Sequence, residues 1–252
     1  MIHHRLQPTL EGKQSPEQMG FRPERGSDDA LLVAECILGQ AIEWNAPVWI
    51  ISIDLQKAFD RIEYKVLFSA LSEQGVDDSY LSLLQRLYSN QSGNVANEIK
   101  FPVTRGVRQG DVLSPLLFNA ALENVISKLK MCLHNHGIKL NDTHRLTNLR
   151  YADDLLLFGK SLAEVLEMLE ILSAELVRVG LSINGSKTKI LTTDLNASSS
   201  ENPLYVDVAG SMVEVLRRGT VHKYLGKAFC GNLRNRGQCN LSHRMQCVTH
   251  NA

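Results

Sequence analysis

Residues 151–158, YADDLLLF, decide the fold, because they place two adjacent acids, Asp153 and Asp154, beside an apolar run. Charged side chains are rarely buried without a partner. An Asp-Asp pair taken alone fits an ordinary surface turn, but such a turn does not need apolar residues on both sides. We therefore predict two short strands joined at a bend that carries the two acids.

A third acid, Asp54, ends the apolar run VWIISID at residues 48–54, which is typical of a core strand. Neighbouring strands in a sheet lie about 5 Å apart, so three carboxylates would converge if these strands are neighbours. Such a cluster raises at least one pKa unless cations relieve it. Mg²⁺ binds carboxylates together with substrate phosphates, and two such ions can stabilise the attacking and leaving oxygens of a phosphoryl displacement. The acids therefore predict two-metal phosphoryl or nucleotidyl transfer.

The remaining pattern mixes helical apolar periods with antiparallel strands and has no regular βαβ rhythm, which predicts an α+β fold. A length of 252 residues and a hydrophobic content of 44% fit one large domain with a proper core. Asp60 and Glu63 predict a capping box, and Ser114 followed by Pro115 predicts a helix start. Residues 1–17 are polar and aperiodic, so we expect a poorly ordered N-terminal remnant there.

No apolar run approaches the roughly 20 residues that a membrane-spanning helix needs, so no membrane contact is expected. Five scattered cysteines indicate reduced thiols in an intracellular protein, with nucleus and cytoplasm both open. Residues 215–252 hold seven Lys or Arg and no Asp or Glu. This basic end fits nucleic-acid binding or a solvated tail. The spacing of Cys230, Cys239, His243 and Cys247 does not match common zinc patterns.

Several ordered motifs together resemble the reverse transcriptase domain of non-LTR (LINE-type) retrotransposons. Beside YADD, they are SIDLQKAFD (52–60), TRGVRQGDVLSPLLFN (104–119), QMGFRPERGSDDA (18–30), GLSINGSKTK (180–189) and HKYLG (222–226). The resemblance implies a right-hand polymerase palm, an antiparallel sheet backed by helices, with fingers and palm over residues 18–226. Because few residues flank these motifs, we expect partial fingers, a largely missing thumb and a basic irregular tail over residues 227–252.

The resemblance also implies roles for single residues. Asp54 and Asp153 would be the principal catalytic metal ligands, with Asp154 assisting. Phe59 matches the steric gate whose ring would occupy the space of a ribose 2′-OH, although it also fits an ordinary core aromatic residue before a helix.

The remaining matches concern the nucleotide and the nucleic acid. The resemblance places at the nucleotide Gln109, Gly110, Lys187 and Tyr151, and at nucleic-acid phosphates Arg22, Arg105 and Arg108. Lys187, Arg105 and Arg108 equally fit ordinary loop cations, and Arg22 fits a triphosphate contact as well as a nucleic-acid one. Phosphate contacts of this kind would position the duplex without reading its sequence.

The resemblance thus implies an RNA-directed DNA polymerase that transfers a nucleotide from a dNTP to a primer 3′-OH with two Mg²⁺ ions, or Mn²⁺ in their place. Its partners would be an RNA template, a DNA primer, the dNTP and the rest of a retroelement polyprotein. A second reading is a catalytically incomplete retroelement remnant that at most binds nucleic acid. An RNA-copying RNA polymerase would share the acids, but Phe59 argues against it. A two-carboxylate glycosidase needs a wider gap between its acids than adjacent residues provide.

Overall fold

The computed structural model describes residues 2–89, 91–95, 99–194, 204–208, 210–216 and 220–229. Its helices are α1 (Ile2–Glu11), α2 (Ser27–Glu43), α3 (Ala58–Arg61), α4 (Tyr64–Glu73), α5 (Asp78–Ser89), α6 (Ser114–Cys132) and α7 (Leu162–Arg178). The strands of the main sheet are β1 (Trp49–Ile53), β6 (Asn148–Tyr151), β7 (Asp154–Gly159), β8 (Lys189–Thr192), β9 (Leu204–Val208) and β10 (Ser211–Val215). Three small two-stranded ribbons are β2 (Ser92–Val95) with β3 (Ile99–Pro102), β4 (Ile138–Lys139) with β5 (Arg145–Leu146), and β11 (His222–Tyr224) with β12 (Lys227–Phe229).

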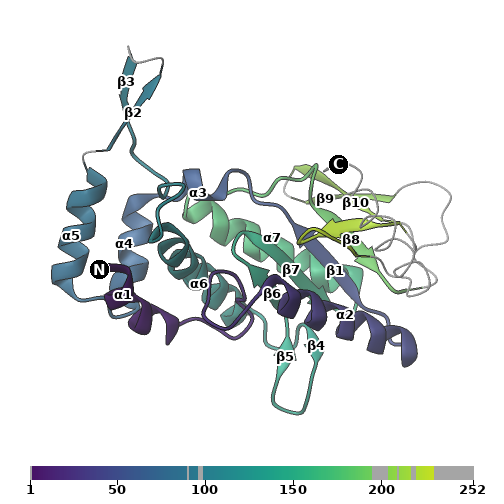
Figure 1. Ribbon diagram of the computed structural model, residues 1–252. Coiled ribbons are helices and arrows are strands. Elements are labelled where there is room, and N and C mark those ends of the chain that lie inside the picture. Colours follow the sequence, from purple (N-terminus) through teal and green to yellow (C-terminus); the bar gives the residue numbers. More distant parts are fainter. Residues whose placement is uncertain are drawn as a thin grey trace, which may run out of the picture.

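The main sheet has the strand order β6-β7-β1-β8-β10-β9 (Figure 1). Its pairings are antiparallel except for β8 with β10, which run parallel, so the sheet is mixed where an antiparallel one was expected. Strands β9 and β10 pair with each other in antiparallel fashion. The α+β class and the palm-like layering of helices on a sheet are as predicted.

Helices cover both faces of the central strands, which explains why those strands read as continuous apolar runs. Alternate residues of a strand point to opposite faces. In β1, Ile51 packs into the core with α4, α6 and α7, whereas Ile50 packs into a second core with α2. Leu155 and Leu156 of β7 divide in the same way. The sheet is therefore a rigid layer whose strand ends are held in fixed register.

The N-terminal expectation is corrected by helix α1, which lies within the stretch expected to be poorly ordered. Leu6 and Leu10, four residues apart, are buried in the core that includes α6. Two leucines one turn apart are too few to produce a recognisable helical period, and Pro8 lies inside the helix. The polar composition therefore concealed a short amphipathic helix.

The predicted capping box at Asp60 and Glu63 is wrong. The chain forms two helices there, because Ile62 adopts an extended conformation between α3 and α4. Glu63 is the residue before α4, and within the described chain its side chain makes no capping hydrogen bond. Asp60 instead lies inside α3 and accepts a hydrogen bond from Gln109.

The predicted helix start is confirmed, because α6 begins at Ser114, whose hydroxyl donates to the Arg108 carbonyl. Residues 227–229, expected in an irregular tail, form β12. Cys230, Cys239, His243 and Cys247 lie outside the described residues. Among the residues that are described, no helix is both long and apolar enough to cross a membrane.

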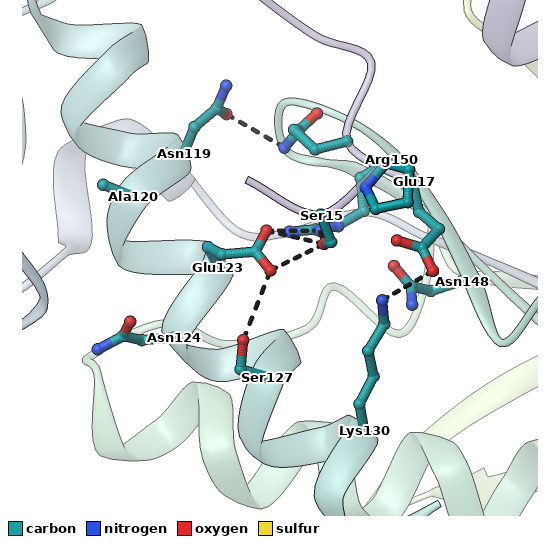
Figure 2. Close-up of polar contacts among 12 residues, drawn as sticks. Ser15, Glu17, Asn119, Ala120, Glu123, Asn124, Ser127, Lys130, Asn148 and Arg150 are labelled. Carbon is teal, nitrogen blue, oxygen red and sulfur yellow. Dashed lines mark hydrogen bonds and ion pairs between the residues drawn. The ribbon is translucent and has the colours of Figure 1, made fainter. Parts of the chain in front are cut away.

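A buried ion pair joins β6 to α6 beneath the sheet edge (Figure 2). Arg150 of β6 donates from Nη2 to Glu123 Oε2 at 2.8 Å, and their side chains are 0% and 6% exposed. Ser15 donates to both Glu123 oxygens and accepts from Arg150 Nη2. Burial alone would raise the pKa of Glu123, but the charge and hydrogen bonds of Arg150 and Ser15 outweigh it and leave that pKa lowered. The pair therefore stabilises the fold only while Glu123 is ionised.

We expect Glu123→Gln to lower the free energy of unfolding by about 3 kcal/mol at pH 7, because it leaves the Arg150 charge buried without a counter-charge. A carboxyl whose pKa is lowered by folding contributes stability above its unfolded pKa and loses it as the pH falls through the folded value. The difference in the free energy of unfolding between wild type and variant should therefore shrink at acidic pH. Urea unfolding at several pH values measures it. Asp142→Asn, at an exposed pair with Lys139, is the control and should change little.

Candidate active site

The three predicted acids meet at one end of the β1–β7 pair. The register pairs Ile53 with Leu155, so Asp54 and Asp154 each stand one residue beyond the last paired residues at the same sheet end. Asp153 lies in the tight turn between β6 and β7. The prediction that these strands are neighbours, with the acids at a bend, is confirmed.

The charges of the acids act on one another. Burial raises the pKa of Asp153, and the charge of Asp54 adds to the rise against a backbone hydrogen bond that lowers it. The pKa of Asp154 is raised to about 6, first by burial among the strand ends and then by the charges of Asp153 and Asp54. The side chain of Asp154 nevertheless reaches the surface. The site thus holds more negative charge than its surroundings neutralise.

Asp54 is oriented by the segment that follows α7. Asn184 Nδ2 donates to Asp54 Oδ2 at 3.0 Å, and the Asn184 backbone nitrogen donates to the Asp54 carbonyl at 2.8 Å. The Asp54 backbone nitrogen donates to Thr188 Oγ1 at 3.4 Å. Lys187 Nζ stands 3.8 Å from Asp54 Oδ1, with its side chain 68% exposed. Lys187 is therefore placed beside the acids, free to turn toward an anionic ligand.

Sequence reasoning missed Asn184 and Tyr224 as members of the site. Asn184 lies in the quoted GLSINGSKTK stretch, and an asparagine between the apolar helix α7 and the strand β8 was the available signal. Tyr224, in HKYLG, is 3% exposed, and its pKa is raised first by burial and then by the charge of Asp154. In the same strand, His222 Nε2 lies 2.8 Å from Ser52 Oγ of β1. The HKYLG strand is therefore attached to the sheet that carries the acids.

A second group of predicted residues surrounds α3, which begins four residues after Asp54. Gln109 Nε2 donates to Asp60 Oδ1 at 2.8 Å. Arg105, Arg108, Gln109 and Asp60 line a cavity of about 660 Å³. Gly110 has a φ of 84°, and a side chain there would meet open space. The cavity thus combines two exposed cations with amide donors.

The turn that carries these residues is fastened to α3 by backbone hydrogen bonds. Gly106 donates to the Ile62 carbonyl at 2.8 Å and Val107 donates to the Phe59 carbonyl at 2.6 Å. A Cβ at Gly106 would lie 2.7 Å from the Asp60 carbonyl oxygen, so this close approach requires glycine. The turn that lines the cavity is therefore held against α3, the helix that follows Asp54 in the chain.

Two other predicted residues, Phe59 and Tyr151, each lie beside another aromatic ring. Phe59 is half-buried and stacks on Phe118 with ring centroids 4.5 Å apart. Tyr151 lies at the start of the acid turn, with its ring centroid 6.3 Å from that of Phe21.

Arg22 is 7% exposed and bonds Glu11 together with the backbone carbonyls of Ser15 and Gln18. These bonds favour a structural role for Arg22 over the predicted nucleic-acid contact.

The donor set of the site fits a hard divalent cation. Carboxylate oxygens are the ligands that Mg²⁺ prefers, and the raised pKa values of Asp153 and Asp154 mark uncompensated charge that a cation would relieve. Within the described ranges, no group of three His, Cys, Asp or Glu is close enough to hold an ion by itself. Mg²⁺ usually takes one or two carboxylates and completes its shell with water and substrate phosphates, which suits this arrangement.

Comparison with known families agrees with the geometry. Residues 1–228 match the family described as reverse transcriptase (RNA-dependent DNA polymerase). The chain therefore belongs to the reverse transcriptase family. The match includes the N-terminal helix α1, which sequence reasoning had left outside the domain.

Similar proteins come from insect retroelements and, in fold, from telomerases. The chain is 27% identical, over 89% of its length, to the Pol polyprotein of the type-2 retrotransposable element R2DM of Drosophila melanogaster, and 28% identical, over 71%, to that of the type-1 element R2 of Popillia japonica. It spans 21% and 30% of those proteins.

Among solved structures, telomerase from Candida albicans, in complex with a fragment of telomeric RNA, matches 92% of the chain with a TM-score of 0.60 and 14% identity. Apo telomerase from Candida tropicalis matches 91% with a TM-score of 0.62 and 15% identity. The chain covers 38% and 39% of these two structures. At such identity the likeness establishes the fold alone.

We expect Asp154→Asn to raise the melting temperature of the metal-free protein at pH 7.5. A carboxyl whose pKa is raised by folding stabilises the fold at low pH, and this contribution is lost as the pH rises through the folded value of about 6. The variant removes the repulsion, so its advantage should fade as the pH falls below 6. Calorimetric scans from pH 5 to pH 8 measure it. An unchanged or lower melting temperature at pH 7.5 would contradict the expected crowding of charge.

Proposed function

We propose that this chain is the polymerising core of an RNA-directed DNA polymerase, which extends a DNA primer along an RNA template with dNTPs. The observation that carries the proposal is the convergence of Asp54 with the Asp153–Asp154 turn at the end of β1 and β7. Membership of the reverse transcriptase family supports it. The likeness to the R2 polyproteins supports a retroelement origin and a place within a longer polyprotein.

In this proposal Asp54 and Asp153 would hold two Mg²⁺ ions, or Mn²⁺ in their place, and Asp154 would assist. Such ions would lower the pKa of the primer 3′-OH and neutralise the triphosphate when bound. Asn184 keeps the Asp54 carboxylate turned toward the site by its 3.0 Å hydrogen bond. Lys187, which reaches to 3.8 Å from Asp54, is placed to contact the triphosphate and to give a proton to the departing pyrophosphate.

The cavity over α3 is the proposed position of the incoming nucleotide and template. Arg105 and Arg108 offer positive charge to phosphates, and Gln109 is held toward the cavity by Asp60. Because Gly110 stands in open space, a ligand backbone could approach it closely. Tyr151 would shape the primer end beside Asp153. An intracellular location remains a prediction from the scattered cysteines.

Primer extension tests the reaction. On poly(rA)/oligo(dT) with dTTP and Mg²⁺, we expect the wild type to extend the primer and Asp153→Asn to be slower by about 100-fold or more, because charge neutralisation at the transition state contributes several kcal/mol. Asp142→Asn is the control, because Asp142 is exposed and pairs with Lys139. Extension should be lost on chelation with EDTA.

The same preparations distinguish the second candidate, a remnant that binds nucleic acid without extending it. Fluorescence anisotropy with the labelled poly(rA)/oligo(dT) duplex reports binding independently of chemistry. Binding without extension in both proteins would support the remnant. Equal extension by wild type and Asp153→Asn would contradict the proposed role of the acids.

Sugar selection tests Phe59 separately. The ring stacks on Phe118, so it is held in place by packing, as a steric gate requires. We expect Phe59→Val to raise rNTP incorporation relative to dNTP by about 10-fold or more, since one pocket contact discriminates by 1–3 kcal/mol. Single-nucleotide insertion of UTP against dTTP measures the ratio. Phe68→Val, at a half-buried ring on α4 beside Tyr64 and Tyr88, is the matched control. A wild type that inserts both nucleotides equally would rule out the gate.

A further inference from the structure

Residues 15–20 lie along the free side of β6, which is the edge strand of the main sheet. The backbone nitrogen of Met19 donates to the Arg150 carbonyl at 2.8 Å, and the backbone nitrogen of Arg150 donates to the Glu17 carbonyl at 2.9 Å. Gln18 and Arg150 form a parallel bridge. This segment therefore continues the sheet past β6, directly beside the turn that carries the acids.

The side chain of Gln18 connects this segment to the acid turn and to α6. Gln18 is 0% exposed. Its Oε1 accepts from the backbone nitrogens of Gly20 at 2.9 Å and Ala152 at 3.2 Å. Its Nε2 donates to Asn119 Oδ1 at 3.2 Å, and Asn119 Nδ2 donates to the Gly20 carbonyl at 2.8 Å. Each polar atom of the amide is thus used, and one of its partners is the residue before Asp153.

The acid turn needs such support because its backbone is unfavourable. Ala152 has a φ of 58°, in the left-handed region that residues other than glycine rarely adopt. Conformations of this kind persist where surrounding contacts over-determine them. Gly20 provides one contact, since a Cβ there would lie 2.9 Å from the Tyr151 carbonyl carbon and closer still to the Ala152 nitrogen. Gln18 provides the hydrogen bond to the same peptide.

The segment is itself anchored at its other end. Ser15 joins the buried pair of Arg150 and Glu123, where Arg150 Nη2 reaches the Ser15 hydroxyl at 2.5 Å (Figure 2). Lys130 of α6 also binds Glu17 at 2.7 Å. The segment that carries Gln18 is therefore held in place by these ionic contacts. A fixed Gln18 can in turn hold the backbone of the turn that carries the acids.

We propose that Gln18 is a positioning residue, which sets the orientation of Asp153 and Asp154 by holding the Ala152 peptide. The proposal rests on the proposed polymerase function, because orientation of the acids matters to a rate only if they act in the reaction. Gln18 acts through Ala152 and is not itself required to touch the nucleotide. Its loss should lower the rate of the chemical step and leave nucleotide affinity unchanged.

A matched control, Gln74, contacts the same helix, α6. Gln74 is also buried, 5% exposed, and its Nε2 donates to the Ala120 carbonyl at 2.6 Å and to Asn124 Oδ1 at 3.0 Å. Both glutamines thus bind an asparagine of α6, but Gln74 does so from the end of α4. Gln18→Met and Gln74→Met remove the same group while keeping the length of the side chain.

We expect both variants to lower the melting temperature, and Gln18→Met alone to lower the kcat of primer extension by about 10- to 100-fold, since small misplacements of reacting groups have effects of this size. The KM for dTTP should stay at the wild-type value. A second measurement needs neither metal nor activity. Hydrogen exchange of the Ala152 amide, followed by NMR in the metal-free protein, should speed up in Gln18→Met and stay unchanged in Gln74→Met.

The outcomes separate the two proposals. If the wild type extends primers and both variants keep the same kcat, the role of Gln18 is overturned while the polymerase function stands. If the wild type does not extend primers, the polymerase function falls, and equal Ala152 exchange in both variants overturns the inference as well. If Gln18→Met does not fold, Gln18→Asn with Gln74→Asn as its control replaces the pair, with the same expected difference.

Discussion

The antiparallel register between β1 and β7 is the constraint on which the site depends. It brings Asp54 to the same sheet end as Asp154, although about 100 residues separate them in the chain. A shift of one residue would turn Asp54 to the other face of the sheet. The register is held by two separate cores, one on each face, so neither face can slip without exposing apolar side chains. Packing far from the acids thereby fixes their separation.

The site concentrates like charge, whereas an ion pair close by in the same hairpin is balanced. Burial raises the pKa of both Asp153 and Asp154, and the charge of Asp54 adds to the rise at each of them. Close to the same hairpin, the Nη2 atom of Arg150 pairs with Glu123 and holds β6 to α6. The turn that follows β6 therefore carries acids whose charges repel one another, whereas Arg150, inside β6, is held by its ion pair with Glu123. This contrast is common where function requires a conformation that packing alone would not choose.

Much of the fold and the acid cluster could be predicted from the sequence, because apolar runs and their terminal acids carry both period and position. The runs YADDLLLF and VWIISID predicted both the paired strands β7 and β1 and the acids at their ends. Helix α1 was missed because two leucines make too short a period, and the capping box failed because Ile62 breaks the helix in a way that composition does not reveal. Asn184 and Gln18 escaped notice because amides act through geometry that only the assembled chain defines. The motif residues around α3 were found by resemblance, because no period or spacing marks them out.

The attachment of residues 15–20 to β6 has a consequence for how the chain reaches its final form. The hydroxyl of Ser15 and the guanidinium of Arg150 are 135 positions apart, so the first segment leaves the ribosome long before its partner strand exists. Contacts this distant in sequence slow folding, because the entropy cost of closing the loop comes before the paired residues contribute favourable contacts. During translation the early segment has no edge to join, and the acid turn gains the support of residues 15–20 only once β6 exists. Nascent chains halted before β6 would thus be sensitive to proteolysis at their amino end, whereas the finished protein would resist it.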